Sequence, residues 1–313
     1  MMFEARRRPG NHINLQMLYI IFFFLGLIWG SFMNVVVFRF KEGEFIFGRK
    51  VLSGRSHCRH CGKTLSWYEL LPLLSFIIQF GRCRACGRWL SFQYPIVEAL
   101  SGLLFLGTAY YFFSYHALDF TSIALKSQWW ILGATVIWAA VFFILLLLSV
   151  IDYREYLVPD ETVYAIFGLA ALWVLWLFGT GHFGLIMGSF LGAYANLFGL
   201  RHDILSNHLF AAFVGFAAIA LIFFLSRGRA IGFGDVKLLA VLGLLFGWPD
   251  IVIILGLAFV IGAAVSLALL AKRQKGIKDF VPFAPFIALS SFLVFFYGSD
   301  IVRLYFYIFN PLY

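Results

Sequence analysis

The stretch VIWAAVFFILLLLSVIDYREYLVPD, residues 136–160, decides the fold class of this chain. Its apolar run Val136–Ile151 ends directly on the carboxylate of Asp152. An ionised side chain at membrane depth costs free energy, so an acid in this place usually marks a functional site. We therefore expect a transmembrane helix that carries a functional carboxylate at its polar end.

A second stretch repeats this arrangement in reverse order. The sequence IGFGD, residues 231–235, ends on Asp235 and is followed by the apolar run Val236–Trp248. Two carboxylates that lie close together and share one proton activate water in aspartic proteases. Asp152 and Asp235 are therefore predicted to form a catalytic pair, in which one acid stays protonated and the other acts as a general base.

The composition is that of a membrane protein. Hydrophobic residues make up 62% of the 313 residues and charged residues only 12%, whereas soluble domains carry about 25% charged residues. We predict an all-α polytopic membrane protein of about eight transmembrane helices, with a small cytoplasmic zinc-ribbon-like insertion after the first helix. The predicted spans are Met17–Phe38, Tyr94–Phe113, Trp129–Val150, Thr162–Phe178, His208–Leu225, Val236–Trp248, Ile251–Leu270 and Pro282–Tyr297.

Basic residues set the expected orientation. The polar region Arg39–Gln93 is rich in Lys and Arg, which favours the cytoplasmic side and places the N-terminus outside. Alternation from there puts the loops 151–160, 226–235 and 271–281 inside, so both aspartates face the cytoplasm. The net charge of +9 then reflects loop placement and indicates no nucleic-acid partner. The first span is too long for a cleavable signal peptide and is expected to remain as a helix.

The apolar segment Gly184–Leu200 complicates the span count. If it crossed the membrane, Asp152 and Asp235 would lie on opposite faces and could not share a water molecule. Its four glycines make it a poor spanning helix, and re-entrant segments are tolerated where protein buries them. We therefore predict that Gly184–Leu200 lies at the outer interface or re-enters.

All four cysteines lie in one short region. They form two C-x-x-C pairs, CRHC and CRAC, separated by 21 residues, a spacing slightly longer than that of zinc ribbons. Glycine follows each pair, at Gly62 and Gly87, and suits a tight turn there. Two disulfides in an oxidising compartment are the alternative. The favoured interpretation is one structural zinc ion bound tetrahedrally by Cys58, Cys61, Cys83 and Cys86.

Three residues near Asp235 are assigned to a substrate loop. Gly232 and Gly234 permit the close approach of a substrate peptide beside the acid. Lys237 either stabilises the ionised form of Asp235 or extends toward the lipid headgroups. The loop is therefore expected to admit the substrate next to Asp235.

Two acids also have simpler interpretations. Pro159 disfavours helix at the residue before it, so Asp160 is expected to cap the helix that follows. Asp152 could be an interfacial charge paired with Arg154 or Lys237, which costs less at a helix end than at its centre.

These motifs, together with others in the same order, resemble the type IV prepilin peptidase family. GSFMNVVVFR, residues 30–39, resembles the family's N-terminal signature. SHCRHCGKTLSWYELLPLLSF and GRCRACGRWLSFQYPIVE resemble its cytoplasmic cysteine region. IDYREYLVPD and GFGDVKLLAVLG resemble its two catalytic motifs, and VPFAPFIAL its C-terminal span. The resemblance runs through nearly the whole chain.

The resemblance implies a GxGD-type aspartic protease in the bacterial cytoplasmic (inner) membrane. Such an enzyme cuts the basic leader of type IV prepilins or pseudopilins after glycine, at the cytoplasmic face. It then methylates the new N-terminus with S-adenosylmethionine, although no Rossmann fingerprint is present and no cofactor-binding residue is assigned. The resemblance makes Asp152 and Asp235 the catalytic pair and the four cysteines the zinc ligands.

The chain departs from the family pattern at three places. Arg154 stands where the family often has a second acid, and Ala284 stands where the last span motif usually has glycine. The gap between the two aspartates is longer than usual by about the length of Gly184–Leu200. None of these departures removes a catalytic group.

The expected domains are the N-terminal tail and first helix (1–38), a cytoplasmic cysteine-rich region (39–93) and a transmembrane peptidase domain (94–313). A peptidase without methyltransferase activity is one alternative function. A membrane transporter or scaffold is another, in which the zinc ribbon docks a partner and the two aspartates belong to an ion pathway.

Overall fold

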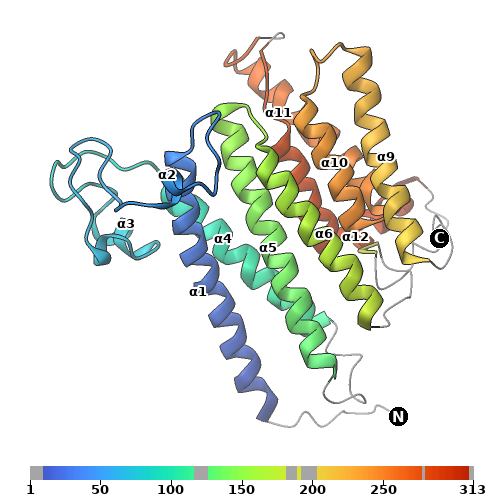
Figure 1. The fold of residues 1–313 in the computed structure, drawn as a ribbon, viewed down its shortest axis with the longest axis horizontal. Coiled ribbons are helices and arrows are strands. Elements are labelled where there is room, and N and C mark those ends of the chain that lie inside the picture. Colours follow the sequence, from blue (N-terminus) through green and yellow to red (C-terminus); the bar gives the residue numbers. More distant parts are fainter. Residues whose placement is uncertain (1–9, 116–125, 181–188, 192–202, 277–278, 310–313) are drawn as a thin grey trace. The chain divides into compact units, whose positions relative to one another are not determined.

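The computed structural model describes residues 10–115, 126–180, 189–191, 203–276 and 279–309. It divides the chain into two compact units, Met1–Ala139 and Ala140–Tyr313. Across the described residues the regular structure is helical, apart from two isolated β-bridges, and seven helices are long and apolar enough to cross a membrane. The prediction of an all-α polytopic membrane protein is confirmed (Figure 1).

The first unit combines two long helices with a small, mostly irregular region. Helix α1 (Gly10–Arg39) packs along α4 (Gln93–Tyr110), and the cysteine region lies between them in sequence. The short elements of this unit are α2 (Arg49–Leu52), η1 (Trp67–Glu69), α3 (Leu74–Ile78) and η2 (Tyr111–Tyr115). The insertion after the first helix is therefore present as predicted.

The second unit is a bundle of long helices. Helix α5 (Lys126–Glu155) starts in the first unit and ends in the second. It is followed by α6 (Asp160–Thr180), α9 (Ile204–Leu225), α10 (Phe233–Phe246), α11 (Asp250–Ala271) and α12 (Ala284–Phe309). The ring of Phe142 on α5 packs against the rings of Phe292 and Phe295 on α12, with centroids 4.9 and 4.8 Å away.

Every predicted span is found as a helix, and the largest difference in length is in α12. Helix α12 extends to Phe309, well past the predicted end at Tyr297, where the backbone leaves helical geometry for one residue. The charged residues Asp300 and Arg303 interrupt the apolar pattern, so the predicted span ended before the helix does. Helix α10 has only 14 residues, about 21 Å of helix, which is shorter than the ~30 Å hydrocarbon layer.

Helices α9 and α10 run antiparallel in the second unit. Near the start of α9, the His208 ring is hydrogen-bonded to the carbonyl of Leu244, at the end of α10. Near the end of α9, the Phe223 ring packs on Phe233, the first residue of α10. Helix α6 packs along α10 and starts next to the start of α10. The end of α6 and the start of α9 therefore lie at the end of the unit away from Asp235 (Figure 1).

The predicted interfacial segment Gly184–Leu200 lies outside the described residues, except for Ser189–Leu191. Those three residues are held at the start of α11. The Ser189 hydroxyl donates to Oδ2 of Asp250 at 2.6 Å, and the Phe190 N–H donates to Oδ1 at 2.8 Å. Asp250 is fully buried and lies at the same end of the unit as the start of α9. The positions of α6 and α9 satisfy the requirement for an even number of crossings between Asp152 and Asp235.

Glycines let α9 and α10 approach closely. A Cβ added at Gly243 would lie 2.3 Å from the carbonyl oxygen of Ala211, and one added at Gly215 would lie 2.4 Å from that of Leu239. Small residues of this kind commonly line contacts between membrane helices. A Cβ at Gly256 on α11, in contrast, meets nothing within 4 Å.

The substitution Gly243→Ala is expected to lower the free energy of unfolding by about 1–3 kcal/mol, because the methyl group has no room beside Ala211. The matched change Gly256→Ala should be neutral or stabilising by up to about 1 kcal/mol, because alanine favours helix and nothing blocks it. Thermal unfolding of the detergent-purified variants measures both effects. Equal midpoints for the two variants would contradict the packing of α9 on α10.

Candidate functional site

Asp152 lies in the last turn of α5, inside the second unit. Only 5% of its surface is exposed. Its Oδ2 accepts a hydrogen bond of 3.1 Å from the backbone N–H of Ala284, the first residue of α12. The carboxylate is therefore buried and held by the start of another helix.

Asp235 lies in the first turn of α10 and is 7% exposed. Its side chain is hydrogen-bonded to the backbone of Gly232, the residue that precedes α10. Its Oδ1 is buried and has no hydrogen-bond partner among the described residues. A buried carboxylate oxygen without a donor costs free energy, so this atom is the one most in need of a partner.

The two carboxylates belong to one site. The negative charge of Asp152 acts on Asp235 across the short gap between the end of α5 and the start of α10. Two buried carboxylates that interact in this way cannot both ionise easily, so the arrangement favours a state with one proton between them. Such a state supplies an acid and a base together, as acid/base chemistry on water requires.

The glycine at position 234 is required by a close contact. An added Cβ would lie 2.7 Å from Cβ of Val158, in the segment that joins α5 to α6. This contact holds the segment after Asp152 against the turn that carries Asp235. Gly234 therefore helps to bring the two halves of the site together.

Lys237 pairs with Asp160. The Nζ atom lies 2.7 Å from Oδ1 of Asp160, and it lies 5.2 Å from the centroid of the Phe233 ring. Asp160 is the first residue of α6, where a carboxylate stabilises the helix. Both side chains are partly exposed, so the ion pair is worth at most about 1 kcal/mol. Lys237, one of the two residues considered as an ion-pair partner of Asp152, is thus paired with Asp160 instead.

The cysteine region of the first unit folds as two matching turns. In each turn the first cysteine accepts a backbone hydrogen bond from the glycine after the pair, Gly62 to Cys58 and Gly87 to Cys83. These glycines have φ angles of +71° and +67°, which glycine adopts without strain. The predicted need for glycine after each pair is confirmed.

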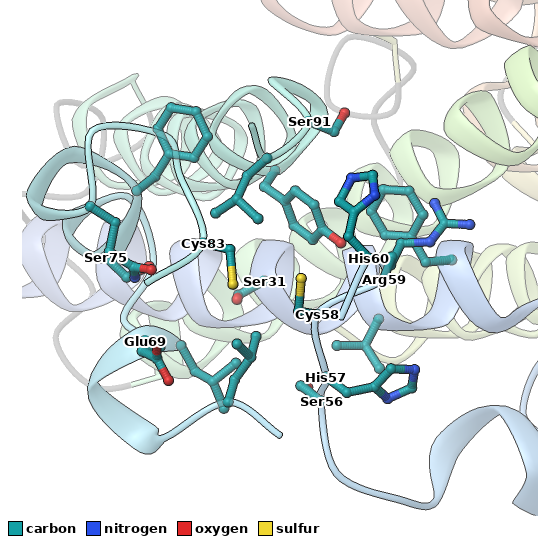
Figure 2. A pocket seen from close by; sticks show the side chains of 18 of the residues that line it. Ser31, Ser56, His57, Cys58, Arg59, His60, Glu69, Ser75, Cys83 and Ser91 are labelled. Atoms are coloured by element: carbon teal, nitrogen blue, oxygen red, sulfur yellow. The ribbon is translucent and has the colours of Figure 1, made fainter. Parts of the chain in front are cut away.

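The four sulfur atoms form one cluster. They all lie within 4.8 Å of one another, and the cysteines are free, so the disulfide alternative is not found. Cys58 and Cys86 have their sulfurs 3.9 Å apart, close to the ~3.8 Å edge of a tetrahedron with metal–sulfur bonds of about 2.3 Å. Figure 2 shows the side chains of Cys58 and Cys83. The cluster could hold a metal ion.

The thiol of Cys83 is prepared for ionisation. Hydrogen bonds from the backbone of Cys86 and then of Ala85 lower the pKa of this thiol to about 7. A thiolate is the form that binds metals. The same turn that positions the sulfur therefore also favours its charged form.

The backbone N–H of Ala284 is the part of the aspartate site that was not predicted. A main-chain donor has no sequence pattern of its own, and the sequence marked Ala284 only as a residue that stands where the family usually has glycine. Asp250 was missed as well. The sequence pattern that could have identified Asp250 is an acid at the start of an apolar run, directly after Trp248 and Pro249.

Two family models match the chain. The Bacterial Peptidase A24 N-terminal domain matches residues 24–112, and the Type IV leader peptidase family matches residues 139–267. The first match contains the cysteine cluster and the second contains both aspartates. No solved structure matches the chain.

Curated relatives match almost the whole chain. A protein of Pseudomonas putida named prepilin leader peptidase/N-methyltransferase is 30% identical over 298 residues, which cover 88% of this chain and 90% of the relative. The chain belongs to the prepilin leader peptidase family. A Bacillus subtilis (strain 168) member of the same name is 32% identical and covers 92% of the chain and 98% of itself. A Stutzerimonas stutzeri member is 30% identical over 306 residues.

The substitution Gly234→Ala is expected to lower the unfolding temperature, because its methyl group would overlap Val158. The double variant Gly234→Ala with Val158→Ala should recover part of the loss, since the smaller side chain leaves room. Thermal unfolding of the parent, both single variants and the double variant gives the coupling between the positions, expected at about 0.5–3 kcal/mol. Simple additivity of the two single effects would show that this contact does not join the two segments.

Proposed function

We propose that this protein is a membrane-embedded aspartic endopeptidase that removes the leader of type IV prepilins or pseudopilins and then methylates the new N-terminus. The observation that carries the proposal is the pair of buried, interacting carboxylates at Asp152 and Asp235. Family membership supports the same activities, because the relatives are named for both.

In this proposal Asp152 and Asp235 are the catalytic residues. The ionised member of the pair accepts a proton from a water molecule, whose oxygen attacks the carbonyl carbon of the scissile peptide. The protonated member donates to the carbonyl oxygen, and a proton reaches the leaving amine as the C–N bond breaks. The N–H of Ala284 keeps Asp152 in position, and the unpaired Oδ1 of Asp235 faces no competing donor among the described residues.

The turn around Gly232 and Gly234 is proposed as the substrate loop. Gly232 has no side chain to shield the Asp235 carboxylate, so a peptide can approach it. Lys237 contributes through its ion pair with Asp160, which ties the start of α10 to the start of α6.

We place the aspartate site at the cytoplasmic face of the bacterial inner membrane. The support is the concentration of Lys and Arg in residues 39–93 and in the loops next to both aspartates, since basic loops remain cytoplasmic. A reducing cytoplasm also suits four free cysteines. The aqueous side of the first unit would then share that compartment.

Zinc is the metal that we propose for the cysteine cluster. Four thiolates in a tetrahedron are a typical structural zinc site, and they leave no position open for a substrate or water. Zinc bound by Cys58, Cys61, Cys83 and Cys86 would stabilise the two turns. S-adenosylmethionine would supply the methyl group that the new N-terminal amine receives.

A peptidase without methyltransferase activity is the less favoured alternative. The chain carries the N-terminal family domain together with the peptidase domain, and its curated relatives bear both activities in their names. A transporter or scaffold does not account for these matches.

The variants Asp152→Asn and Asp235→Asn are each expected to reduce cleavage of a prepilin at least ~100-fold, because each removes one member of the acid/base pair. The control is Asp300→Asn, which changes an exposed carboxylate that pairs with Arg303 far from the start of α12 and should keep most of the activity. Cleavage is measured with purified protein in detergent or proteoliposomes. Activity near that of the parent in either test variant would rule out the catalytic pair.

The purified protein is expected to contain about one zinc ion per chain. The double variant Cys58→Ser with Cys83→Ser should lose it, because both buried ligands are removed. His57→Ala is the control and should keep the metal, since its Nδ1 is already paired with the carbonyl of Arg55. Elemental analysis by mass spectrometry measures the metal. A zinc-free parent protein, or zinc retained after loss of two cysteines, would contradict the site.

A further inference from the structure

A cavity of about 470 Å³ lies in the first unit, apart from the aspartate pair. The end of α1, the start of α4 and the cysteine region surround it (Figure 2). Its volume is within the ~300–1,000 Å³ typical of small-molecule sites. Its lining combines polar and aromatic side chains, among them Ser31, Arg39, Arg59, Glu69, Phe76, Trp89, Tyr94 and Glu98.

Two buried acids line this cavity. Glu69 and Glu98 are each 6% exposed, although carboxylates are rarely buried to this degree. Oε2 of Glu98 accepts the N–H of Leu73 at 2.8 Å, and the side chain of Ser31 also hydrogen-bonds to this carboxylate. Glu98 is therefore fixed in place, with its carboxyl group at the cavity.

One oxygen of Glu69 has no hydrogen-bond partner, although it lies in an ion pair with Lys63. Its Oε2 accepts the N–H of Ser66 at 2.9 Å. Its Oε1 is buried and has no hydrogen-bond partner in the described structure. The ammonium group of Lys63 lies 3.7 Å from Oε1, too far for a hydrogen bond. A hydrogen-bond donor inside the cavity would satisfy this atom.

Aromatic rings supply the rest of the lining. Phe76, Trp89 and Tyr94 border the cavity together with Phe38. Aromatic faces bind flat heterocycles by stacking, and they attract cations. The carboxylates of Glu69 and Glu98, the guanidinium groups of Arg39 and Arg59 and the aromatic rings together suit a small molecule that carries a flat ring and charges of both signs.

We propose that this cavity binds S-adenosylmethionine, with its cationic end toward Glu69 and Glu98 and its adenine against the aromatic rings. The inference rests on the methyltransferase activity proposed above and gives that activity a location. Cys58 and Cys83 also line the cavity, so the metal-binding turns form one of its walls. Loss of the metal should therefore weaken binding of the methyl donor.

The test measures binding to the full-length, zinc-containing protein in detergent. Isothermal titration calorimetry with S-adenosylmethionine should show that Glu69→Gln weakens affinity about tenfold, because a charged partner is lost. Glu44→Gln is the matched control, since Glu44 pairs with Lys50 outside the cavity and should leave affinity unchanged. Ser75→Trp, which fills the cavity without removing a charge, should also weaken binding. Zinc content checks that each variant is folded.

Two further readouts locate the ligand. The parent should bind S-adenosylmethionine more tightly than S-adenosylhomocysteine, whose sulfur carries no charge. The variant Glu69→Gln should reduce that difference in affinity. Ultraviolet cross-linking of radiolabelled S-adenosylmethionine should label a peptide that contains Phe76, Trp89 or Tyr94. A parent that binds the donor and methylates cleaved pilin, but is labelled elsewhere and is unaffected by Glu69→Gln and Ser75→Trp, would overturn the cavity assignment alone. A parent that neither binds the donor nor transfers methyl groups would overturn both this assignment and the proposed methyltransferase activity.

Discussion

Burial of two carboxyl groups close together is the constraint on which the second unit depends. Asp152 and Asp235 are nearly inaccessible, and the charge of Asp152 acts on Asp235. Bringing them together requires the end of α5 and the start of α10 to lie at one end of the bundle. It therefore fixes the number of crossings between them, which α6 and α9 supply as a pair. Helix direction, loop placement and chemistry follow from that one condition.

Close backbone packing makes this arrangement possible. Gly215 and Gly243 let α9 and α10 touch along their main chains, and Gly234 lets Val158 rest on the turn before Asp235. Packing and hydrogen bonds hold membrane helices together, since lipid tails are as apolar as leucine side chains. The N–H of Ala284 adds a polar contact from α12 to the acid of α5. Precise helix contacts thus set the geometry of the carboxylate pair.

The cysteine region of the first unit is stabilised in a different way. Its cysteine region is too short and irregular to bury a large apolar core, and a metal cluster stabilises such regions by binding free energy. Two turns with glycine at positive φ angles bring four sulfurs within reach of one ion. The same turns close one side of a cavity that contains two buried acids. The cysteine cluster, which could hold a metal ion, and this cavity are therefore neighbours in the first unit.

By itself the sequence determined the membrane class, the approximate helices, the two acids at helix ends and the four-cysteine cluster. Those features depend on local pattern: apolar length, charge at a boundary, and the spacing of ligands with glycine after them. Tertiary structure alone decided that Lys237 pairs with Asp160, that Ala284 holds Asp152, and that Glu69 and Glu98 share a cavity. Each of these joins residues far apart in the chain or uses a backbone group. Their proximity arises from helix packing, and no local pattern records it.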